Sequence, residues 1–385
     1  MATVLPEKGS AHRIESLTDM IHSKPAQSVL THGLLLVNVV VFVAMLGWGA
    51  SVWHTSTAVP LAWGANFGPA TQDGQWWRLF TAMFIHFGLW HLVMNMWALR
   101  DVGRLVERLY GPWRFAAIYV VGGVLGNLLS LVVQGNRAVS GGASGAIFGL
   151  YGALMVFLWR ERRQVDPWEF RWLFGSASVF TVLMLGMGWV IPGIDNSAHG
   201  GGLVAGALMA RVLAKPWTPR SPLGRFGQWA AVAALVSGAG WLAGHIPPPR
   251  YLLHDELRAQ AAIQRFTVAD QRISQQWGNI LNAAPAQGLT FDQLAGQIES
   301  TVTAGYERTF EQLMAATPGT QAPSAPALVA LQAYASQRAQ VSRDLAQGLR
   351  TNDPQKIRDA LRQVQGRPGA ASKTRPASAT ASATR

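Results

Sequence analysis

A serine and a histidine in this sequence have the side chains and the surroundings that nucleophilic hydrolysis needs. Ser144 lies in a glycine-dense stretch, residues 140–152, within a run from Arg137 to Arg160 that has no charged residue between its ends. His199 lies near the start of another apolar run. An imidazole can take the proton of a serine hydroxyl during attack on a carbonyl and return it to the leaving amine. Taken singly, each side chain is more often a hydrogen-bonded packing residue, so the chemistry depends on a fold that brings the two together.

Two further polar residues are spaced to serve the same reaction. His91 and Asn95 are four residues apart, so they point from one face of a helix. They can donate hydrogen bonds to an oxyanion, together with the backbone N–H of Ser144, which has no helical acceptor if Ser144 lies in the first turn. The alternative is that the two side chains only bond neighbouring helices.

Other chemistries fit the sequence poorly. The 385 residues include no cysteine, which excludes thiolate catalysis, disulfides and zinc–cysteine sites. His86 and His91 are five residues apart and diverge on a helix, and no HExxH pattern occurs, so neither a metal nor a cofactor is expected. The GxSxG elbow of soluble hydrolases is absent because residue 146 is alanine.

The elements that carry these residues are predicted to be membrane helices. The chain is 49% hydrophobic and only 14% charged, which is typical of a polytopic membrane protein. Seven apolar runs are long enough to span a bilayer. Six of them cover about residues 29–51, 113–134, 144–159, 172–191, 197–213 and 226–245. The second run along the chain begins at about residue 86.

The spans also predict a depth and an orientation for the site. The helix from Ser144 to Arg160 is about 24 Å long, which is shorter than the hydrocarbon core of about 30 Å. The helix from His199 to Lys215 has the same length, so the serine and the histidine are expected at equal depth. Lys and Arg gather in alternate loops, which places the N-terminus in the cytoplasm and the site near the outer surface. The net charge of +12 is therefore a topology signal and not evidence of nucleic-acid binding.

Glycines are expected to let the fourth and sixth spans approach closely, because they clear one face of each helix. The residues concerned are Gly145, Gly149 and Gly152 in one span and Gly202 and Gly206 in the other. Asp195 precedes His199 by four residues and is a candidate to orient the imidazole. Pro192 and Gly193 place this aspartate in a loop, so its role is open.

The composition becomes that of a soluble protein after three consecutive prolines, residues 247–249. Apolar residues at helical spacing predict helices from about Leu253, Leu294 and Leu331, and Asp353-Pro354 predicts the start of a fourth. The expected organisation is a cytoplasmic tail (1–28), a six-span core (29–215), a seventh span (226–245), a soluble helical domain on the outer side (250–365) and a disordered tail (366–385).

Taken together, these motifs resemble those of the rhomboid family of intramembrane serine proteases. The resemblance covers about residues 30–215. Its pieces are Trp77-Arg78, His86-Phe-Gly-Leu-Trp-His91-Leu-Val-Met-Asn95, Glu107, Gly142-Ala-Ser144-Gly145 and Ala198-His199-Gly-Gly-Gly202. The GxSG motif alone is weak evidence of a resemblance to this family. The motifs together, in this order, are a highly specific sign of it.

The resemblance implies that Ser144 is the nucleophile, that His199 is its base without a third acid, and that His91, Asn95 and the Ser144 amide form the oxyanion hole. Phe148 stands where some members carry a tyrosine stacked on the histidine, and phenylalanine keeps that stacking. Arg78 and Glu107 match positions that brace the first loop and the second helix. The other expected supports are His86, Gly142, Gly145, Gly202 and Gly206.

Residues and resemblance together predict an all-α protein: a six-span rhomboid-like membrane bundle with a seventh span and a soluble α-helical C-terminal domain. The expected activity is that of a serine endopeptidase acting on transmembrane protein substrates within a lipid bilayer, with a bacterial inner membrane as the expected location. A catalytically silent relative that binds or escorts membrane clients is the alternative, and the presence of all four polar site residues disfavours it. A solute transporter is disfavoured because neither inverted repeats nor intramembrane acids are evident.

Overall fold

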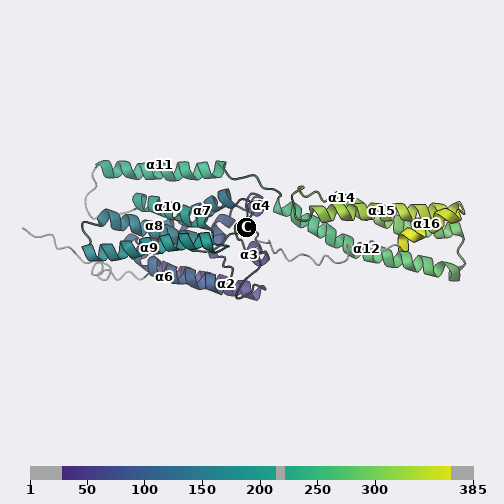
Figure 1. Cartoon of the computed structure of the whole chain (residues 1–385), viewed down its shortest axis with the longest axis horizontal. Helices are drawn as coiled ribbons and strands as arrows, with labels where there is room; N and C mark the ends of the chain where they lie inside the picture. The colour runs from purple at the N-terminus through teal and green to yellow at the C-terminus, as the bar shows by residue number, and fades with distance from the viewer. Residues whose placement is uncertain (1–27, 214–221, 366–385) are drawn as a thin grey trace, which may run out of the picture. The chain divides into compact units, whose positions relative to one another are not determined.

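A computed structural model describes residues 28–213 and 222–365 (Figure 1). Within these ranges the regular structure is helical, apart from one isolated antiparallel bridge between Asn66 and Ser140. The chain separates into two compact units, with the division between Pro248 and Pro249. The predicted N-terminal and C-terminal tails lie outside the described residues, except for Ser28.

The first unit contains the apolar runs. Its helices are α2 (Val29–Gly47), α3 (Ala58–Ala62), α4 (Gly68–Thr71), α5 (Arg78–Thr81), η1 (Ala82–Phe84), α6 (Leu89–Tyr110), α7 (Pro112–Gln134), α8 (Ser144–Glu161), α9 (Pro167–Val190), α10 (Asn196–Leu213) and α11 (Pro222–Gly244). The long helices run roughly along one direction as a bundle (Figure 1).

Helix α8 lies at the centre of this bundle. Thirteen of its 18 residues are buried, whereas α9 buries only Ala177 and Thr181. The core around α8 is formed with α6 and α7 by large side chains, among them Leu99, Phe115, Ile118 and Leu150. The residues that follow Ser144, from Gly145 to Leu154, are all buried within the protein.

Among the described helices, four are long and apolar enough to cross a membrane: α2, α7, α9 and the Arg225–Gly244 part of α11. The segment Arg78–Phe84 with α6 forms a fifth candidate, bent by 94° at the break. The protein is therefore an integral membrane protein with several candidate spans. Helices α8 and α10 fall outside this set; each contains several glycines, which suits helices packed against other helices. The seven-span arrangement stays a prediction.

Several helix starts differ from the sequence-based prediction, among them those of α6 and α9. The second span was expected from about His86, but α6 begins at Leu89, and His86 lies in the extended segment before it. The backbone at Gly88 passes so close to the carbonyl oxygen of Trp53 that a Cβ would collide with it. The fifth span was expected from residue 172, but α9 begins at Pro167. Asp166 caps it by accepting from the N–H groups of the next two non-proline residues, and proline favours the first helical position.

The long loop between α2 and α6 is held by Arg78. Its Nη1 donates to the carbonyl oxygens of Leu61 (2.6 Å) and Ala65 (3.0 Å), and its Nε donates to Gln75 Oε1 (2.9 Å). Because the guanidinium is buried, these acceptors satisfy donors that water does not reach. Arg78 therefore ties the loop into a fixed shape around the starts of the central helices.

Glu107 joins α6 to the start of α2. Its carboxylate accepts from the backbone N–H groups of Leu30 (2.9 Å) and Thr31 (2.8 Å), and from Thr31 Oγ1 (2.6 Å). These N–H groups belong to the first turn of α2 and have no acceptor within that helix. A buried carboxylate at this point therefore satisfies the helix terminus and its positive dipole end together.

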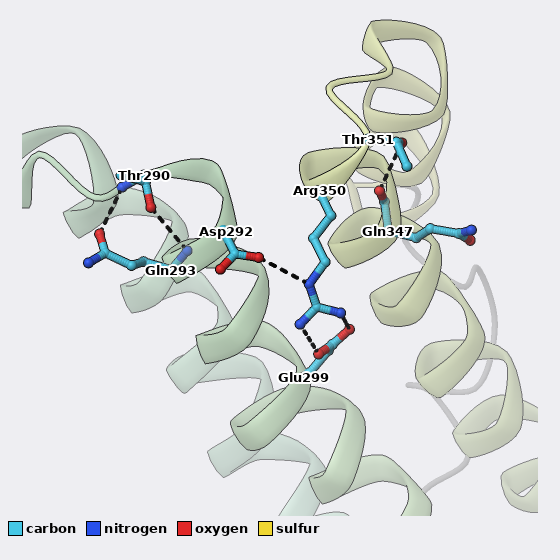
Figure 2. A network of polar contacts seen from close by, with 7 residues as sticks. All are labelled: Thr290, Asp292, Gln293, Glu299, Gln347, Arg350 and Thr351. Carbon is cyan, nitrogen blue, oxygen red and sulfur yellow. Dashed lines mark hydrogen bonds and ion pairs between the residues drawn. The ribbon is translucent and has the colours of Figure 1, made fainter.

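The second unit contains α12 (Leu253–Gln287), α13 (Phe291–Gln297), the π-helix η2 (Ile298–Thr303), α14 (Ala304–Met314), α15 (Ala325–Arg350) and α16 (Pro354–Gln365). It has its own core, in which Trp277, Tyr306 and Leu345 are almost completely buried. Figure 2 shows one polar cluster of this unit, where the Arg350 guanidinium forms two hydrogen bonds to the Glu299 carboxylate, of 2.7 and 2.6 Å. Asp292 lies 3.4 Å from Arg350 Nε.

Candidate active site

Two helix starts bring the candidate serine and histidine together. Ser144 is the first residue of α8, and His199 lies in the first turn of α10. The distance between His199 Nε2 and Ser144 Oγ is 2.9 Å, which is a hydrogen-bond distance. His199 is buried, so the imidazole is held in one place by its neighbours. The pair has the geometry in which a base can accept the proton of a serine hydroxyl.

Glycines set the separation of the two helices. A Cβ atom at Gly206 would collide with the carbonyl oxygen of Gly149, and one at Gly202 would collide with that of Gly145. Gly152 meets the carbonyl oxygen of Leu203 in the same way. The backbones of α8 and α10 therefore lie in direct contact, a spacing that no larger residue would allow. This contact runs along both helices from the end that carries the serine and histidine.

Phe148 lies one helical turn after Ser144 and packs flat on the histidine. The ring centroids of Phe148 and His199 are 4.3 Å apart, and the ring planes differ by 8°. A stacked ring limits rotation of the imidazole about its side-chain bonds, so that Nε2 keeps facing the serine. Phe148 carries no hydroxyl, so its contribution to the site is this contact.

We expect Phe148→Ala to lower the rate of substrate cleavage about fivefold, because an aromatic pair contributes roughly 1 kcal/mol beyond the area that it buries. Phe148→Tyr keeps the ring and should retain most of the rate. The measurement is the initial rate on a single-span model substrate, and Phe226→Ala, at an exposed position of α11, is the control. Equal rates for Phe148→Ala and the wild type would show that the stack does not hold the imidazole.

The segment before α8 places His91 beside Ser144. Gly142 has φ +129°, a conformation that favours glycine, and a Cβ built there would lie 2.7 Å from His91 Nε2 and 3.8 Å from Ser144 Oγ. His91 therefore reaches the peptide that leads into α8. The backbone N–H of Ser144 has no acceptor among the described residues. Both donors therefore lie close to the Ser144 hydroxyl.

Asn95, which the sequence predicts as a donor to the oxyanion, already forms a side-chain hydrogen bond. Its Nδ2 donates to the carbonyl oxygen of His91, at 2.8 Å, within α6. The amide group has a second hydrogen, which this bond does not use. Asn95 is buried on the same helix face as His91, one turn further along.

His86 packs against His91 rather than against the serine. The two imidazole centroids are 5.0 Å apart in an edge-on arrangement, and the His86 side chain is fully buried. Neither ring nitrogen of His86 has a hydrogen-bond partner in the described part of the chain. The structure therefore gives His86 a packing contact that fixes the His91 ring. Within the described ranges, no group of three or more His, Asp or Glu side chains is arranged to hold a metal ion.

The Asp195 carboxylate forms hydrogen bonds at the start of α10 and with the segment before α8, but it forms none with the His199 imidazole. Its Oδ1 accepts from the backbone N–H of Ala198 (3.1 Å) and from the Ser197 hydroxyl, and its Oδ2 accepts from the hydroxyls of Ser140 (2.7 Å) and Ser130. Burial alone would raise the pKa of Asp195, but these hydrogen bonds outweigh it and lower the pKa below its ordinary value. His199 Nδ1 has no partner within the described ranges.

The serine cluster around Asp195 is the part of the site that sequence reasoning missed. Ser130 and Ser140 are 65 and 55 residues away from the aspartate in the chain. The one available signal was local: an aspartate three residues before Ala198, ahead of an apolar run, is a pattern for a helix N-cap.

Known proteins are similar to this chain in the region that carries the candidate site. A model of the Rhomboid domain matches residues 73–216, which include all the candidate site residues. The chain is 37% identical over 190 residues to Rhomboid protease GluP of Bacillus subtilis, covering 49% of this chain and 35% of that protein. It is 34% identical over 147 residues to Putative rhomboid protease YdcA of the same species, covering 38% of this chain and 71% of that protein.

A third relative gives a similar match. The chain is 32% identical over 183 residues to Rhomboid-like protease 1 of Toxoplasma gondii, covering 45% of this chain and 58% of that protein. The chain thus spans only about a third to a half of the length of several relatives that it matches. The matched domain lies within the first unit, since it ends at residue 216.

Proposed function

The chain belongs to the rhomboid family, and on that premise we propose that it is an intramembrane serine endopeptidase with Ser144 and His199 as its catalytic dyad. The observation that carries the proposal is the 2.9 Å distance between His199 Nε2 and Ser144 Oγ, inside a helical bundle. The relatives from Bacillus subtilis and Toxoplasma gondii, whose names describe them as rhomboid proteases, support the same reaction class.

The proposed reaction has two stages, and in each of them His199 takes one proton and then gives it up. Ser144 Oγ attacks the peptide carbonyl carbon while His199 Nε2 takes the hydroxyl proton, giving a tetrahedral oxyanion. The imidazolium then donates this proton to the leaving amine as the C–N bond breaks, which leaves an acyl-enzyme. A water molecule, deprotonated by the same nitrogen, attacks the acyl carbon and releases the carboxylic acid, and the proton returns to Ser144.

The proposed oxyanion hole consists of the Ser144 N–H, His91 and Asn95. The N–H at the start of α8 and the His91 ring near Gly142 support this assignment, because both lie beside the hydroxyl. Asn95 takes part through its second amide hydrogen, since the first is bonded to the carbonyl oxygen of His91. The Ser144 N–H and the second amide hydrogen of Asn95 remain available as donors, which suits charge that appears only in the transition state.

Transmembrane protein segments are the proposed substrates. A peptide bond in a membrane helix is shielded by its own hydrogen bonds, so the segment must unwind before it reaches Ser144. Helix α9 is the peripheral helix beside α8 and buries few residues, which supports entry at this side of the bundle. By family resemblance, we propose that helix-breaking residues and a small side chain before the cut site favour cleavage.

We propose that the N-terminus is cytoplasmic and that the second unit lies on the outer side of the membrane, because seven spans would separate them. A periplasm-sensitive reporter fused after Gly366 is expected to be active, and a cytoplasm-sensitive reporter at the same position is expected to be silent. The control is the same pair of reporters fused after Arg163, in the basic loop between α8 and α9, which should give the opposite signals. A cytoplasmic signal at Gly366 would mean that α11 does not cross the bilayer.

The proposed function is tested by cleavage of a single-span model substrate with purified protein in liposomes. We expect wild-type protein to cut the substrate and Ser144→Ala to leave it intact, whereas Ser237→Ala, on α11, should cut at the wild-type rate. If wild-type protein cuts no faster than Ser144→Ala, the protease proposal fails. Retained binding of the substrate in that case would favour a silent rhomboid-like protein that escorts membrane clients.

A further inference from the structure

One carboxylate connects the two segments that carry Ser144 and His199. Asp195 immediately precedes α10, and its carbonyl oxygen accepts from the His199 N–H at 3.1 Å. Its Oδ1 accepts from the Ala198 N–H at 3.1 Å and from the Ser197 hydroxyl. This half of the carboxylate caps the first turn of α10, the turn that contains His199.

The other oxygen of the same carboxylate faces away from α10. Asp195 Oδ2 accepts from Ser140 Oγ at 2.7 Å and from Ser130 Oγ, which lies on α7. Ser140 is four residues before Ser144, and it is fixed on its other side by paired backbone hydrogen bonds to Asn66, both of 2.8 Å. The segment that leads into α8 is thus tied to the cap of α10.

The geometry points to Asp195 as a positioning residue that sets the register between Ser144 and His199: Oδ1 fixes the histidine's helix turn, and Oδ2 fixes the segment before the serine. This inference rests on the proposed function for its catalytic consequence. Asp195 does not touch the imidazole, so it acts on the distance between the two reacting groups and not on the charge of the ring by direct contact. Hydrogen bonds to an ionised acceptor are stronger than neutral ones, which suits a single residue that holds three chain segments.

Because Oδ1 caps α10 and Oδ2 bonds the two serines, mutation can remove the bonds to the serines without removing the cap. Ser130→Ala with Ser140→Ala removes both bonds to Oδ2 and leaves the cap of α10 in place. Asp195→Ala removes cap and connection together. Asp353→Ala is the matched control, because Asp353 caps α16 in the second unit through the N–H groups of Gln355 and Lys356.

The first readout is the steady-state rate on the single-span substrate. We expect Asp195→Ala to lower kcat about a hundredfold and the double serine variant about tenfold, with KM unchanged in both, because a displacement of about 1 Å between reacting groups has effects of this size. Asp353→Ala should keep the wild-type kcat.

The second readout does not depend on catalysis. The chain has no cysteine, so a pair of spin labels can be introduced at Trp159 on α8 and Val204 on α10, both of which are exposed. We expect the distribution of label distances to broaden in Asp195→Ala and in the double serine variant, and to stay narrow in Asp353→Ala.

The proposal is overturned if the double serine variant matches the wild type in both kcat and distance distribution, since Asp195 would then act only as a helix cap. A lower kcat that comes with a narrow distribution would also overturn it, because the register would be intact. If the wild type does not cleave any substrate, the proposed function fails, and the distance distributions still decide whether Asp195 sets the register of α8 and α10.

Discussion

Replacing His199 with alanine is expected to lower the rate of peptide cleavage about 10⁴-fold, because general acid–base catalysis by a positioned side chain contributes up to about that factor. The variant keeps the serine, but nothing then removes its proton or protonates the leaving amine. The measurement is the initial rate on the single-span substrate in liposomes. His245→Ala, at the end of α11, is the matched control and should keep the wild-type rate.

Ser144 and His199 should also behave as one unit. In a dyad, either single loss removes the same reaction path, so the double variant Ser144→Ala, His199→Ala is expected to be no slower than Ser144→Ala alone. Multiplicative losses would indicate that the two side chains contribute independently. A His199→Ala variant within tenfold of the wild type would contradict the assignment of His199 as the base.

Adding one methyl group at Gly206 is expected to disrupt both the fold and the site. A Cβ at this position would collide with the backbone of Gly149, which cannot move away without separating α8 from α10. We expect Gly206→Ala to lower the free energy of unfolding by about 1–3 kcal/mol, the usual cost of overpacking. Because the same contact sets the separation of Ser144 and His199, cleavage by the folded fraction should fall about a hundredfold.

The control for this prediction lies on α11. Gly240 has open space where a Cβ would stand, so Gly240→Ala should change neither the unfolding midpoint nor the cleavage rate. Both variants are measured by thermal unfolding in detergent and by cleavage in liposomes. Wild-type stability and activity in Gly206→Ala would show that the backbones of α8 and α10 are not in direct contact.

Much of the site could be predicted from sequence because its signals are local. The glycine-dense stretch 140–152 indicated that Ser144 lies in the first turn of its helix, and the glycine spacing in α8 and α10 indicated which faces meet. The equal lengths of helix after Ser144 and His199 suggested that these residues lie at one level. Their 2.9 Å separation agrees with that suggestion. Helix periodicity and glycine spacing require no knowledge of distant residues.

The remaining features depend on contacts between distant parts of the chain. No local pattern indicated that Glu107 would cap α2, which begins almost eighty residues earlier, or that Asp195 would bond Ser130 and Ser140. The start of α6 was misplaced because His86 continues an apolar run, while the close approach of Gly88 to Trp53 decides where the helix begins. The apolar runs at 144–159 and 197–213 did predict helices α8 and α10, but they did not indicate how deeply each helix is packed among its neighbours.

The central claim is that Ser144 is a nucleophile activated by His199, and covalent labelling tests it most directly. Wild-type protein in liposomes is treated with a fluorophosphonate, digested and examined by mass spectrometry. We expect one adduct, on the peptide that contains Ser144, formed much more slowly in His199→Ala and absent in Ser144→Ala. An adduct on a different residue, or labelling of Ser144 at the same rate with and without His199, would contradict this claim.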